Sequence, residues 1–438
     1  MNKLMPNVQI IRRPFGRGAS LVVVAFLIGG MLMPISPASA DTVDSRITFE
    51  GSPLAIAINP AGTFAYVSYY GSGTISRINL ATNKEDASIK IDYVGVPGNV
   101  TINPTGTFAY VVDWGESAML TRINLATNKV DAEISNKGQT SMAINPAGTF
   151  AYVANIGFNR VVRINLATNK VDATIRPVYL SPKGAQSGAG GSQAIAINPA
   201  GTYAYVTSIP SFNYKTRVQE AGAVSRINLA TNKVDASITI GDEPEGIAIN
   251  PAGTFAYVVD RKSGTVSRIN LATYKLDATI KVGDDPENVR INPTGTFAYV
   301  TNRRSNTISK INLATNNVDA TIAVGKEPGD LAITPTGTFA YVVNEGPGTV
   351  SRIKLDSGTP VLTTTEPVSS SAIAAYAKLI VLNGATISIN VAPSSTQYCK
   401  VSGTNLHGVK PGSCTVTVIV KPKSGKAVSK TMTLTVTK

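Results

Sequence analysis

Residues 250–258 read Asn-Pro-Ala-Gly-Thr-Phe-Ala-Tyr-Val, and this stretch recurs along the chain with few changes. Its proline presets φ for a turn and its glycine is free to adopt a positive φ, so the first residues indicate a tight turn. The residues that follow are good β-formers whose side chains alternate, which indicates a strand. The seven copies are marked by their second aromatic residue, at Tyr66, Tyr110, Tyr152, Tyr205, Tyr257, Tyr299 and Tyr341.

The spacing of the copies sets the architecture. Neighbouring copies lie 42 to 53 residues apart, most often 42. The unit at residues 245–282 contains four short β-like runs joined by turns, which we name strands A to D in chain order, and no stretch has a helical period. A period near 42 with four strands per unit matches one blade of a β-propeller. The sequence therefore predicts an all-β fold built around a seven-bladed β-propeller.

The two ends of the repeat region complement each other. The seventh copy ends near Leu355 and lacks strand D. Residues 43–49 precede the first copy in the same register in which residues 276–282, a strand D, precede the sixth copy. We therefore expect the N-terminal segment to supply strand D of the last blade, which closes the ring and hides sheet edges that favour aggregation.

A column of charges supports this register. A basic residue on strand C is followed nine residues later by an aspartate on strand D, in the pairs Arg77 and Asp86, Arg122 and Asp131, Arg163 and Asp172, Arg226 and Asp235, Arg268 and Asp277, and Lys310 and Asp319. Across a C–D hairpin these residues would form solvated ion pairs worth at most about 1 kcal/mol each. In a closed ring, Arg352 of the last blade should meet Asp44.

The repeat resembles a known family. Tyr-Val-Thr-Asn at 299–302, Tyr-Val-Ala-Asn at 152–155 and the repeated Ile-Asn-Leu-Ala-Thr-Asn-Lys segments are similar to the YVTN family of β-propeller repeat proteins, over residues 43–355. The resemblance implies a secreted or cell-surface propeller of the kind found in surface-layer and adhesion-like proteins. The chain departs from the family by placing Arg-Ile-Asn where Val-Ile-Asp is usual, which alters the outer strands and not the fold.

A second unit follows the propeller. Residues 358–371 are rich in Thr, Ser and Pro and indicate a linker. Residues 372–438 contain short alternating strands and indicate a small β-sandwich, which is similar to bacterial Ig-like domains around Cys399 and Cys414. The chain has no other cysteine, so we expect a disulfide between these two and not a metal site.

The first forty residues have the pattern of an export signal. Lys3, Arg12, Arg13 and Arg17 precede the apolar run 21–32, and Ala38-Ser39-Ala40 is a cleavage motif. The run is too short for a comfortable membrane span, so we expect cleavage after Ala40 and no integral membrane segment afterwards. The general secretory route is expected, with the twin-arginine route as the alternative. The predicted organisation is a signal peptide at 1–40, a propeller at 41–357, a linker at 358–371 and a sandwich at 372–438, giving a secreted or cell-surface protein.

The C-terminal unit is strongly basic. From Thr359 onward the chain has eight lysines and a single acidic residue, Glu366. A Lys-rich surface without arginine or interleaved aromatic residues is a poor reader of nucleic acid, so none is expected as a partner. Anionic wall polymers or lipid headgroups are the expected partners of this surface, and a purely solubilising role is the alternative.

Catalytic groups are scarce. The sole histidine, His407, lies in the C-terminal unit and is expected in a loop. A Ser-His-Asp arrangement and a histidine zinc site are therefore excluded from the propeller, and no cofactor is expected.

Glu245, Glu287 and Asp330, with Asn99 and Asn288, could ring a channel mouth and hold a hard cation as a secondary alternative. We therefore expect a non-catalytic protein, with a lactonase-like hydrolase, by fold analogy, and a structural surface-array component as alternatives.

The comparison of blades indicates where a ligand would bind. The A–B and C–D corners are nearly identical in every blade, while the D–A and B–C corners vary. Because strands alternate in direction, the variable corners share one face, and loops carry specificity on a rigid scaffold. We call this the variable face and the opposite one the uniform face, and we expect a glycan, envelope polymer or surface protein on the former; unconstrained drift of loops is the alternative. The predicted contact residues are Tyr69, Tyr70, Asp113, Trp114, Arg160, Tyr214, Asp260, Arg261, Arg303 and Arg304.

Overall fold

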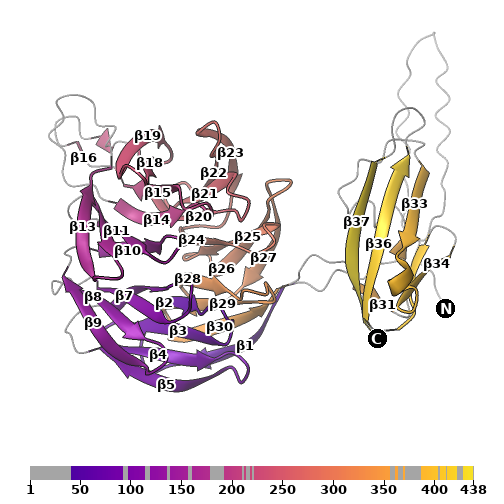
Figure 1. Cartoon of the computed structure of the whole chain (residues 1–438), viewed down its shortest axis with the longest axis horizontal. Coiled ribbons are helices and arrows are strands. Elements are labelled where there is room, and N and C mark those ends of the chain that lie inside the picture. Colours follow the sequence, from indigo (N-terminus) through magenta and orange to yellow (C-terminus); the bar gives the residue numbers. More distant parts are fainter. Residues whose placement is uncertain are drawn as a thin grey trace, which may run out of the picture. The chain divides into compact units, whose positions relative to one another are not determined.

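Seven four-stranded antiparallel sheets follow one another around a ring in the computed structural model (Figure 1). The structure describes residues 41–437 except 92–96, 114–118, 136–138, 156–159, 178–191, 210–211, 214–217, 220, 356–360, 364–367, 370–385, 403–404, 411 and 422–427. The predicted signal peptide therefore lies outside the described residues. The seven-bladed propeller expected from the repeat is confirmed.

The blades have nearly identical strand lengths. Blades 1 and 2 consist of β2 (Pro53–Ile58), β3 (Phe64–Tyr69), β4 (Thr74–Asn79), β5 (Lys84–Lys90), β6 (Pro97–Ile102), β7 (Phe108–Asp113), β8 (Met119–Asn124) and β9 (Lys129–Ser135). Blades 3 and 4 consist of β10 (Gln139–Ile144), β11 (Phe150–Asn155), β12 (Arg160–Asn165), β13 (Lys170–Ile175), β14 (Ser192–Ile197), β15 (Tyr203–Ser208), β18 (Ala223–Asn228) and β19 (Lys233–Thr239), with a small hairpin of β16 (Phe212–Asn213) and β17 (Val218–Gln219). Blades 5 and 6 consist of β20 (Pro244–Ile249), β21 (Phe255–Asp260), β22 (Thr265–Asn270), β23 (Lys275–Lys281), β24 (Pro286–Ile291), β25 (Phe297–Asn302), β26 (Thr307–Asn312) and β27 (Asn317–Ala323). Blade 7 consists of β28 (Pro328–Ile333), β29 (Phe339–Asn344), β30 (Thr349–Lys354) and β1 (Thr42–Thr48).

The repeated motif builds both the turn and the core. In blade 5 the Asn250 side chain accepts hydrogen bonds from the backbone N–H groups of Thr254 and Phe255 at 2.8 and 2.9 Å. Gly253 adopts φ 66°, the left-handed region that favours glycine. Tyr257 on the following strand is almost completely buried against the next blade, in a cluster that includes Val289. The uniform corners are therefore repeated because the fold itself needs them.

The ring closes as predicted. Strand β1 pairs antiparallel with β30, from Thr42 opposite Lys354 to Thr48 opposite Thr349. The Arg352 guanidinium lies 2.9 Å from the Asp44 carboxylate. The N-terminal segment therefore supplies strand D of the last blade.

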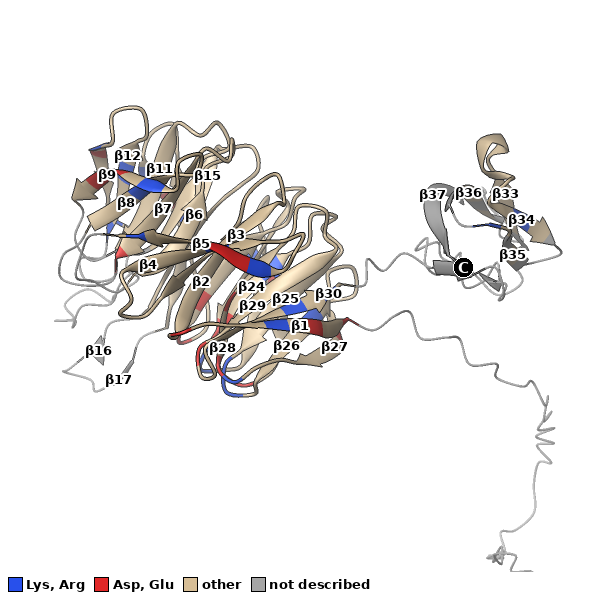
Figure 2. Ribbon diagram, turned by 90° about the horizontal axis from the view of Figure 1, so that it is seen from below, with Lys and Arg blue, Asp and Glu red and all other residues tan. Residues whose placement is uncertain are grey.

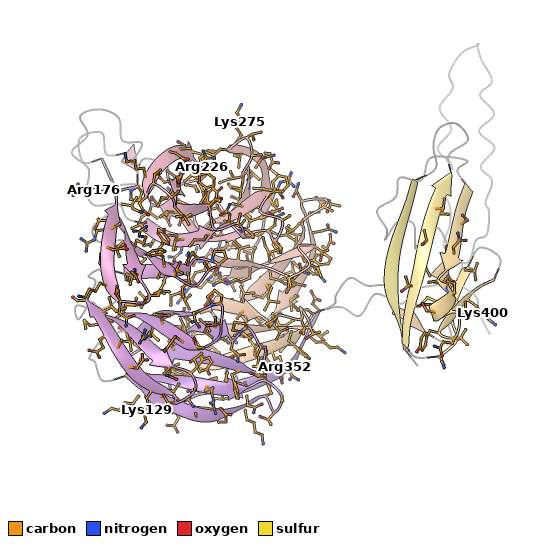
Figure 3. The ribbon with its side chains drawn as sticks, viewed as in Figure 1. Lys129, Arg176, Arg226, Lys275, Arg352 and Lys400 are labelled. Atoms are coloured by element: carbon orange, nitrogen blue, oxygen red, sulfur yellow. A yellow bond between two sulfur atoms is a disulfide. The ribbon has the colours of Figure 1, made fainter. Side chains whose placement is uncertain are left out.

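The charge column forms with one exception. The five arginines on strand C of blades 1 to 5 lie 2.8 Å from their predicted aspartates, and rim residues such as Arg226 and Arg352 can be followed in Figure 3. The pairing of Lys310 with Asp319 is wrong, because the Lys310 ammonium lies 2.9 Å from Asp41. The Asp41 side chain is fully buried and needs a counter-charge, while Asp319 is exposed and accepts a hydrogen bond from Asn312. Figure 2 shows charges of both signs where β1 lies beside β26 and β27.

The C-terminal unit consists of two small sheets. One has the order β31 (Val361–Thr363), β37 (Val428–Thr437), β36 (Gly412–Lys421) and β33 (Thr386–Val391), and the other β32 (Val368–Ser369), β35 (Asn405–Gly408) and β34 (Cys399–Ser402). The predicted linker at 358–371 is therefore wrong in part, because β31 and β32 belong to these sheets. Short strands without an alternating pattern of their own gave no signal there.

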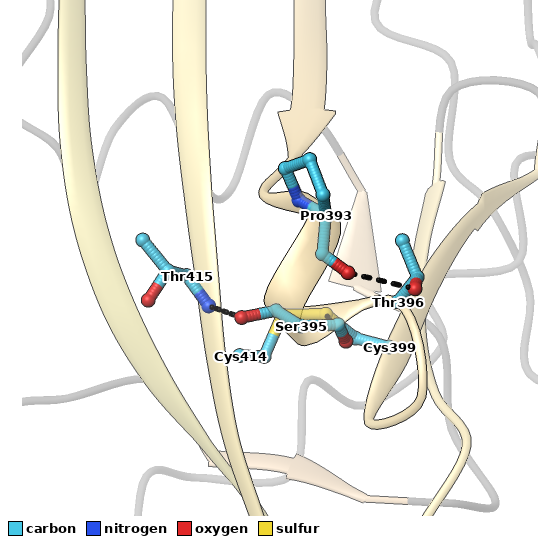
Figure 4. Close-up of a disulfide and its surroundings, with 6 residues drawn as sticks. All are labelled: Pro393, Ser395, Thr396, Cys399, Cys414 and Thr415. Atoms are coloured by element: carbon cyan, nitrogen blue, oxygen red, sulfur yellow. Dashed lines mark hydrogen bonds between the residues drawn. A yellow bond between two sulfur atoms is a disulfide. The ribbon is translucent and has the colours of Figure 1, made fainter.

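The disulfide is confirmed. Cys399 and Cys414 are bonded and completely buried, with their Cα atoms 5.9 Å apart (Figure 4). Beside the bond, Ser395 of the short 3₁₀ helix η1 (Pro393–Ser395) accepts a hydrogen bond from the backbone of Thr415 at 2.9 Å. His407 lies on strand β35, so its expected loop position is wrong. Within the described ranges, no helix has the length and apolar character needed to cross a membrane.

Candidate functional site

A cavity of about 310 Å³ lies at one end of the central channel. The A strands β2, β6, β10, β14, β20, β24 and β28 contact each other in sequence around the ring and form the channel wall. Most of the lining residues stand near the starts of these strands, beside the D–A corners, so the cavity is at the variable face. All seven blades contribute: Leu54, Ala55, Asn99, Ser141, Gln193, Ala194, Ile195, Glu245, Gly246, Ile247, Glu287, Asn288, Arg290, Gly329, Asp330 and Glu345 line it.

The wall of this channel cavity divides into two halves. Blades 1 to 4 contribute small, apolar or amide side chains, and every charged lining residue comes from blades 5 to 7. Arg290 is the clearest departure from the repeat. The equivalent residues of the other blades are Ala57, Thr101, Ala143, Ala196, Ala248 and Ala332. The fold therefore accepts a small residue at this position six times, and a guanidinium once.

Asp330 is the centre of a buried polar network. Its carboxylate accepts hydrogen bonds from the backbone N–H groups of Ile56 at 3.1 Å and Leu331 at 2.9 Å. Asn288 Nδ2 donates to it at 2.7 Å and Arg290 Nη2 at 2.9 Å. Burial raises the Asp330 pKa, and Arg290 and the two backbone groups oppose that rise. The network joins blades 6, 7 and 1 across the closing point of the ring.

Arg303 gathers three carboxylates from blades 6 and 7. Its guanidinium lies 2.7 Å from Glu345 and 3.3 Å from both Glu287 and Glu327. These bonds, that to Glu345 foremost, raise the Arg303 pKa. Burial raises the pKa of Glu287 although Arg303 lowers it. Arg303 therefore holds these three carboxylates together, and they balance its positive charge.

Glu245 is less well compensated than the other lining carboxylates. Its closest guanidinium among the described residues is that of Arg261, at 3.9 Å, and Arg261 is bonded mainly to Asp285 at 2.6 Å. Gln193 donates to Glu245 over a long 3.5 Å. Burial, and after it the charge of Glu287, raises the Glu245 pKa to about 7. This carboxyl group therefore changes protonation near neutral pH.

The structure divides the predicted contact residues into four groups. Tyr70 is 64% exposed, Arg304 is exposed, and Arg261 and Arg303 lie beside the channel cavity, so these side chains are available at the variable face. Arg160 is half-buried on β12. Trp114 and Tyr214 lie outside the described residues.

Three predicted contact residues are buried at the ends of B strands. Tyr69, Asp113 and Asp260 are each at most 3% exposed. Asp260 shows the physical reason, because it accepts hydrogen bonds from the backbone N–H groups of Asp242 and Ser263 and holds two variable corners in place. The three side chains are buried within the variable face, and their role as ligand contacts stays a prediction.

Sequence reasoning missed Arg290 and Glu345. A charged residue where the other blades have alanine or threonine was a signal that could have identified Arg290. The structure does not support the alternative prediction that Glu245, Glu287 and Asp330 hold a cation. Among the described residues no three His, Cys, Asp or Glu side chains are placed to hold one metal ion, and Asp330 and Glu287 are bonded to Arg290 and Arg303.

The repeat architecture agrees with a known family. A family model described as lactonase, 7-bladed β-propeller, matches residues 33–282 and 270–373. The chain belongs to this lactonase family. A similar solved structure is that of hydrazine synthase from Kuenenia stuttgartiensis, with a TM-score of 0.60 and 18% identity over 71% of this chain and 98% of that one, which supports the fold of the lactonase-family propeller. No curated protein matches the sequence.

Proposed function

We propose that this lactonase-family propeller is an exported, non-catalytic binding protein of the bacterial cell envelope. It takes a glycan, an envelope polymer or a group of a surface protein at its variable face, with the channel cavity as the anchoring site. The observation that carries the proposal is the charged half of this cavity, which interrupts an otherwise regular repeat. Arg290 and the carboxylates around it are not required by the blade fold, since six blades manage without such a residue at the position of Arg290.

The unfavourable free energy of burying these charged groups is an argument that the channel cavity binds a ligand. Burying charged groups is unfavourable unless they are paired, and the channel cavity contains more carboxylates than guanidinium groups. Proteins place such destabilising groups at functional sites, where the ligand offsets the unfavourable environment. A purely structural ring needs only a small, uncharged residue at the position of Arg290, as the other six blades have.

The location is proposed on sequence grounds. The signal-like residues 1–40 favour export, and the lysine-rich C-terminal unit favours attachment to anionic envelope polymers. The similarity of the blades to YVTN repeats and of the C-terminal sheets to bacterial Ig-like domains belongs to the same proposal.

The function is tested by removing two charged side chains of the channel cavity, with circular dichroism to establish that the variant is folded at the temperature of the assay. We expect the double variant Glu245→Gln and Arg290→Gln to reduce binding to envelope fractions at least tenfold, measured by pull-down with the protein lacking residues 1–40. The matched control is Lys275→Ala, at a C–D corner of the uniform face (Figure 3). Equal binding by the double variant, the control and the wild type would contradict the proposed site.

A second candidate function is lactone hydrolysis, favoured by Glu245. A carboxylate with a pKa near 7 suits a general base, which takes a proton from water as the water oxygen attacks the lactone carbonyl. The acyl C–O bond of the ring then breaks, and the departing alkoxide oxygen takes the proton that Glu245 removed from water. Arg261, 3.9 Å from Glu245, would stabilise the negative charge on the carbonyl oxygen.

This second function predicts a definite pH profile. Because the base must be ionised, the turnover of a simple γ- or δ-lactone should be low below pH 6, rise through about pH 7 and level off above it. Glu245→Gln should lower the rate by roughly 10² to 10⁴. If the wild type hydrolyses no lactone faster than buffer does, this candidate is excluded.

A further inference from the structure

The balance of positive and negative charges in the channel cavity indicates the chemical class of ligand that it binds. Six carboxylates and three guanidinium groups lie at the variable-face end of the channel in three salt-bridged clusters, which we together call the charge network. The carboxylates belong to Glu245, Asp285, Glu287, Glu327, Asp330 and Glu345, and the guanidinium groups to Arg261, Arg290 and Arg303. The network is therefore short of positive charge.

Among the carboxylates that line the channel cavity, Glu245 is the one without a close guanidinium partner. Asp330 has Arg290 at 2.9 Å, Glu345 has Arg303 at 2.7 Å and Glu287 shares Arg303 at 3.3 Å. Glu245, the remaining lining carboxylate, has its nearest guanidinium at 3.9 Å. A positively charged group in the channel cavity beside Glu245 would neutralise this carboxylate.

The opposite wall has a different character. Leu54, Ala55, Ala194 and Ile195 line the channel cavity from blades 1 and 4, with no charged residue among the lining residues of blades 1 to 4. The amide of Gln193 lies between this wall and Glu245, to which it is bonded. A ligand that fills the cavity therefore meets carboxylates at one side and, at the other, an uncharged wall of aliphatic side chains with Asn99 and Ser141 between them.

We infer, building on the proposed binding function, that the channel cavity takes a primary alkylammonium group carried on an apolar stem. The ammonium group lies against Glu245 and Glu287, and the stem lies along Leu54, Ala194 and Ile195. A carboxylate or phosphate ligand is repelled by the same network. A lysine side chain of a partner polypeptide and a free alkylamine share this chemistry.

Binding of such a cation is linked to protonation of Glu245. The charged groups that face Glu245 are Glu243, Arg261, Asp285 and Glu287, and three of these four are acidic. An ammonium ligand favours the ionised form, so below a pKa of about 7 its binding must displace a proton from Glu245. Alkylammonium groups themselves stay charged up to about pH 10. Affinity therefore rises with pH between 6 and 8, and for a single site this rise is about tenfold.

The experiment uses three ligands of equal length and different charge. Hexylamine, 1-hexanol and hexanoate are titrated into the protein lacking residues 1–40, with dissociation constants measured by NMR at pH 6 and pH 8. We expect hexylamine at pH 8 to bind at least tenfold more tightly than hexanol, and hexanoate to bind more weakly than either. A short peptide containing one lysine, compared with the same peptide containing norleucine, distinguishes a polypeptide source from a free amine.

Glu245→Gln provides the decisive variant. It keeps the size of the side chain and removes its charge, so hexylamine should bind more weakly and with the same affinity at both pH values. Asp277→Asn is the matched control, because Asp277 is an acid of the same blade on the outer rim and is paired with Arg268. The control should retain both the affinity and the pH dependence of the wild type.

The outcomes separate the ligand class from the proposed function. If hexanol or hexanoate matches hexylamine, or if Glu245→Gln keeps the pH dependence, the alkylammonium assignment is overturned. The binding function would survive this result provided that the Glu245→Gln, Arg290→Gln variant still loses envelope binding. If that variant binds envelope fractions normally, the proposed site fails as well.

Discussion

Replacing Asp41 by alanine should lower the free energy of unfolding by about 3 to 5 kcal/mol, because it leaves the Lys310 ammonium buried without its partner. The two side chains lie 2.9 Å apart, with 0% of Asp41 and 8% of Lys310 exposed. The pair joins the segment that begins strand β1 to blade 6, while β1 itself pairs with β30 of blade 7. Denaturant unfolding of the protein lacking residues 1–40 measures the loss.

Matched variants distinguish the effect of breaking a buried ion pair from that of breaking an exposed one. Lys310→Met alone should destabilise by a similar amount, since it removes the ammonium group that lies 2.9 Å from the buried Asp41 carboxylate. Combining Asp41→Leu with Lys310→Met should restore most of the loss, because a buried ion pair and an apolar pair of similar size differ little in stability. Asp86→Ala, which breaks an exposed rim pair, should cost no more than about 1 kcal/mol. Equal effects of Asp41→Ala and Asp86→Ala would contradict this assignment.

Loss of this contact should also change the solution behaviour of the protein. When β1 leaves the ring, the backbone of β30 becomes an unpaired edge, which is a template for pairing with another chain. Variants at Asp41 should therefore aggregate during heating at temperatures at which Asp86→Ala stays soluble. Light scattering during a thermal ramp detects the difference.

Most of the propeller could be predicted because its information is local and repeated. The turn at 250–253 fixes the position of strand B, and the copies fix the register of every blade. Ring closure could also be predicted, because Asp44 and Arg352 continue a column that the other blades define. The pairing of Lys310 could not, since Asp41 lies outside the repeat and is brought to Lys310 only by the closure of the ring.

The sequence places the predicted contact residues at the variable face, and the structure shows which of them are exposed there and which are buried. Variation among the corners identified the variable face, where Arg261 and Arg303 lie beside the channel cavity. Corner variation does not distinguish exposed side chains from buried ones, so Asp260, which supports the backbone of its corners, was included. Arg290 lies on an inner strand and was missed, although its replacement of alanine is visible in the repeat.

Asp330→Ala should combine a large loss of stability with a loss of ligand binding. The buried carboxylate accepts hydrogen bonds from two backbone N–H groups, from Asn288 and from Arg290. Removing it leaves the Ile56 and Leu331 N–H groups without this acceptor and the Arg290 guanidinium without its carboxylate. We expect a decrease of about 3 to 5 kcal/mol in the free energy of unfolding, as for other broken buried pairs.

The effect on binding follows from the position of the network. Arg290 and Asn288 line the channel cavity, and Asp330 fixes both side chains. Asp330→Asn keeps the size and one acceptor of the side chain, but its amide group faces two N–H donors and a guanidinium. It should therefore lose most of the stability that Asp330→Ala loses, whereas Asp319→Ala on the exposed rim should lose at most about 1 kcal/mol. If Asp330→Asn matches the wild type in both unfolding and envelope binding, the carboxylate charge does not organise the channel, and the asymmetry of its wall would need another cause.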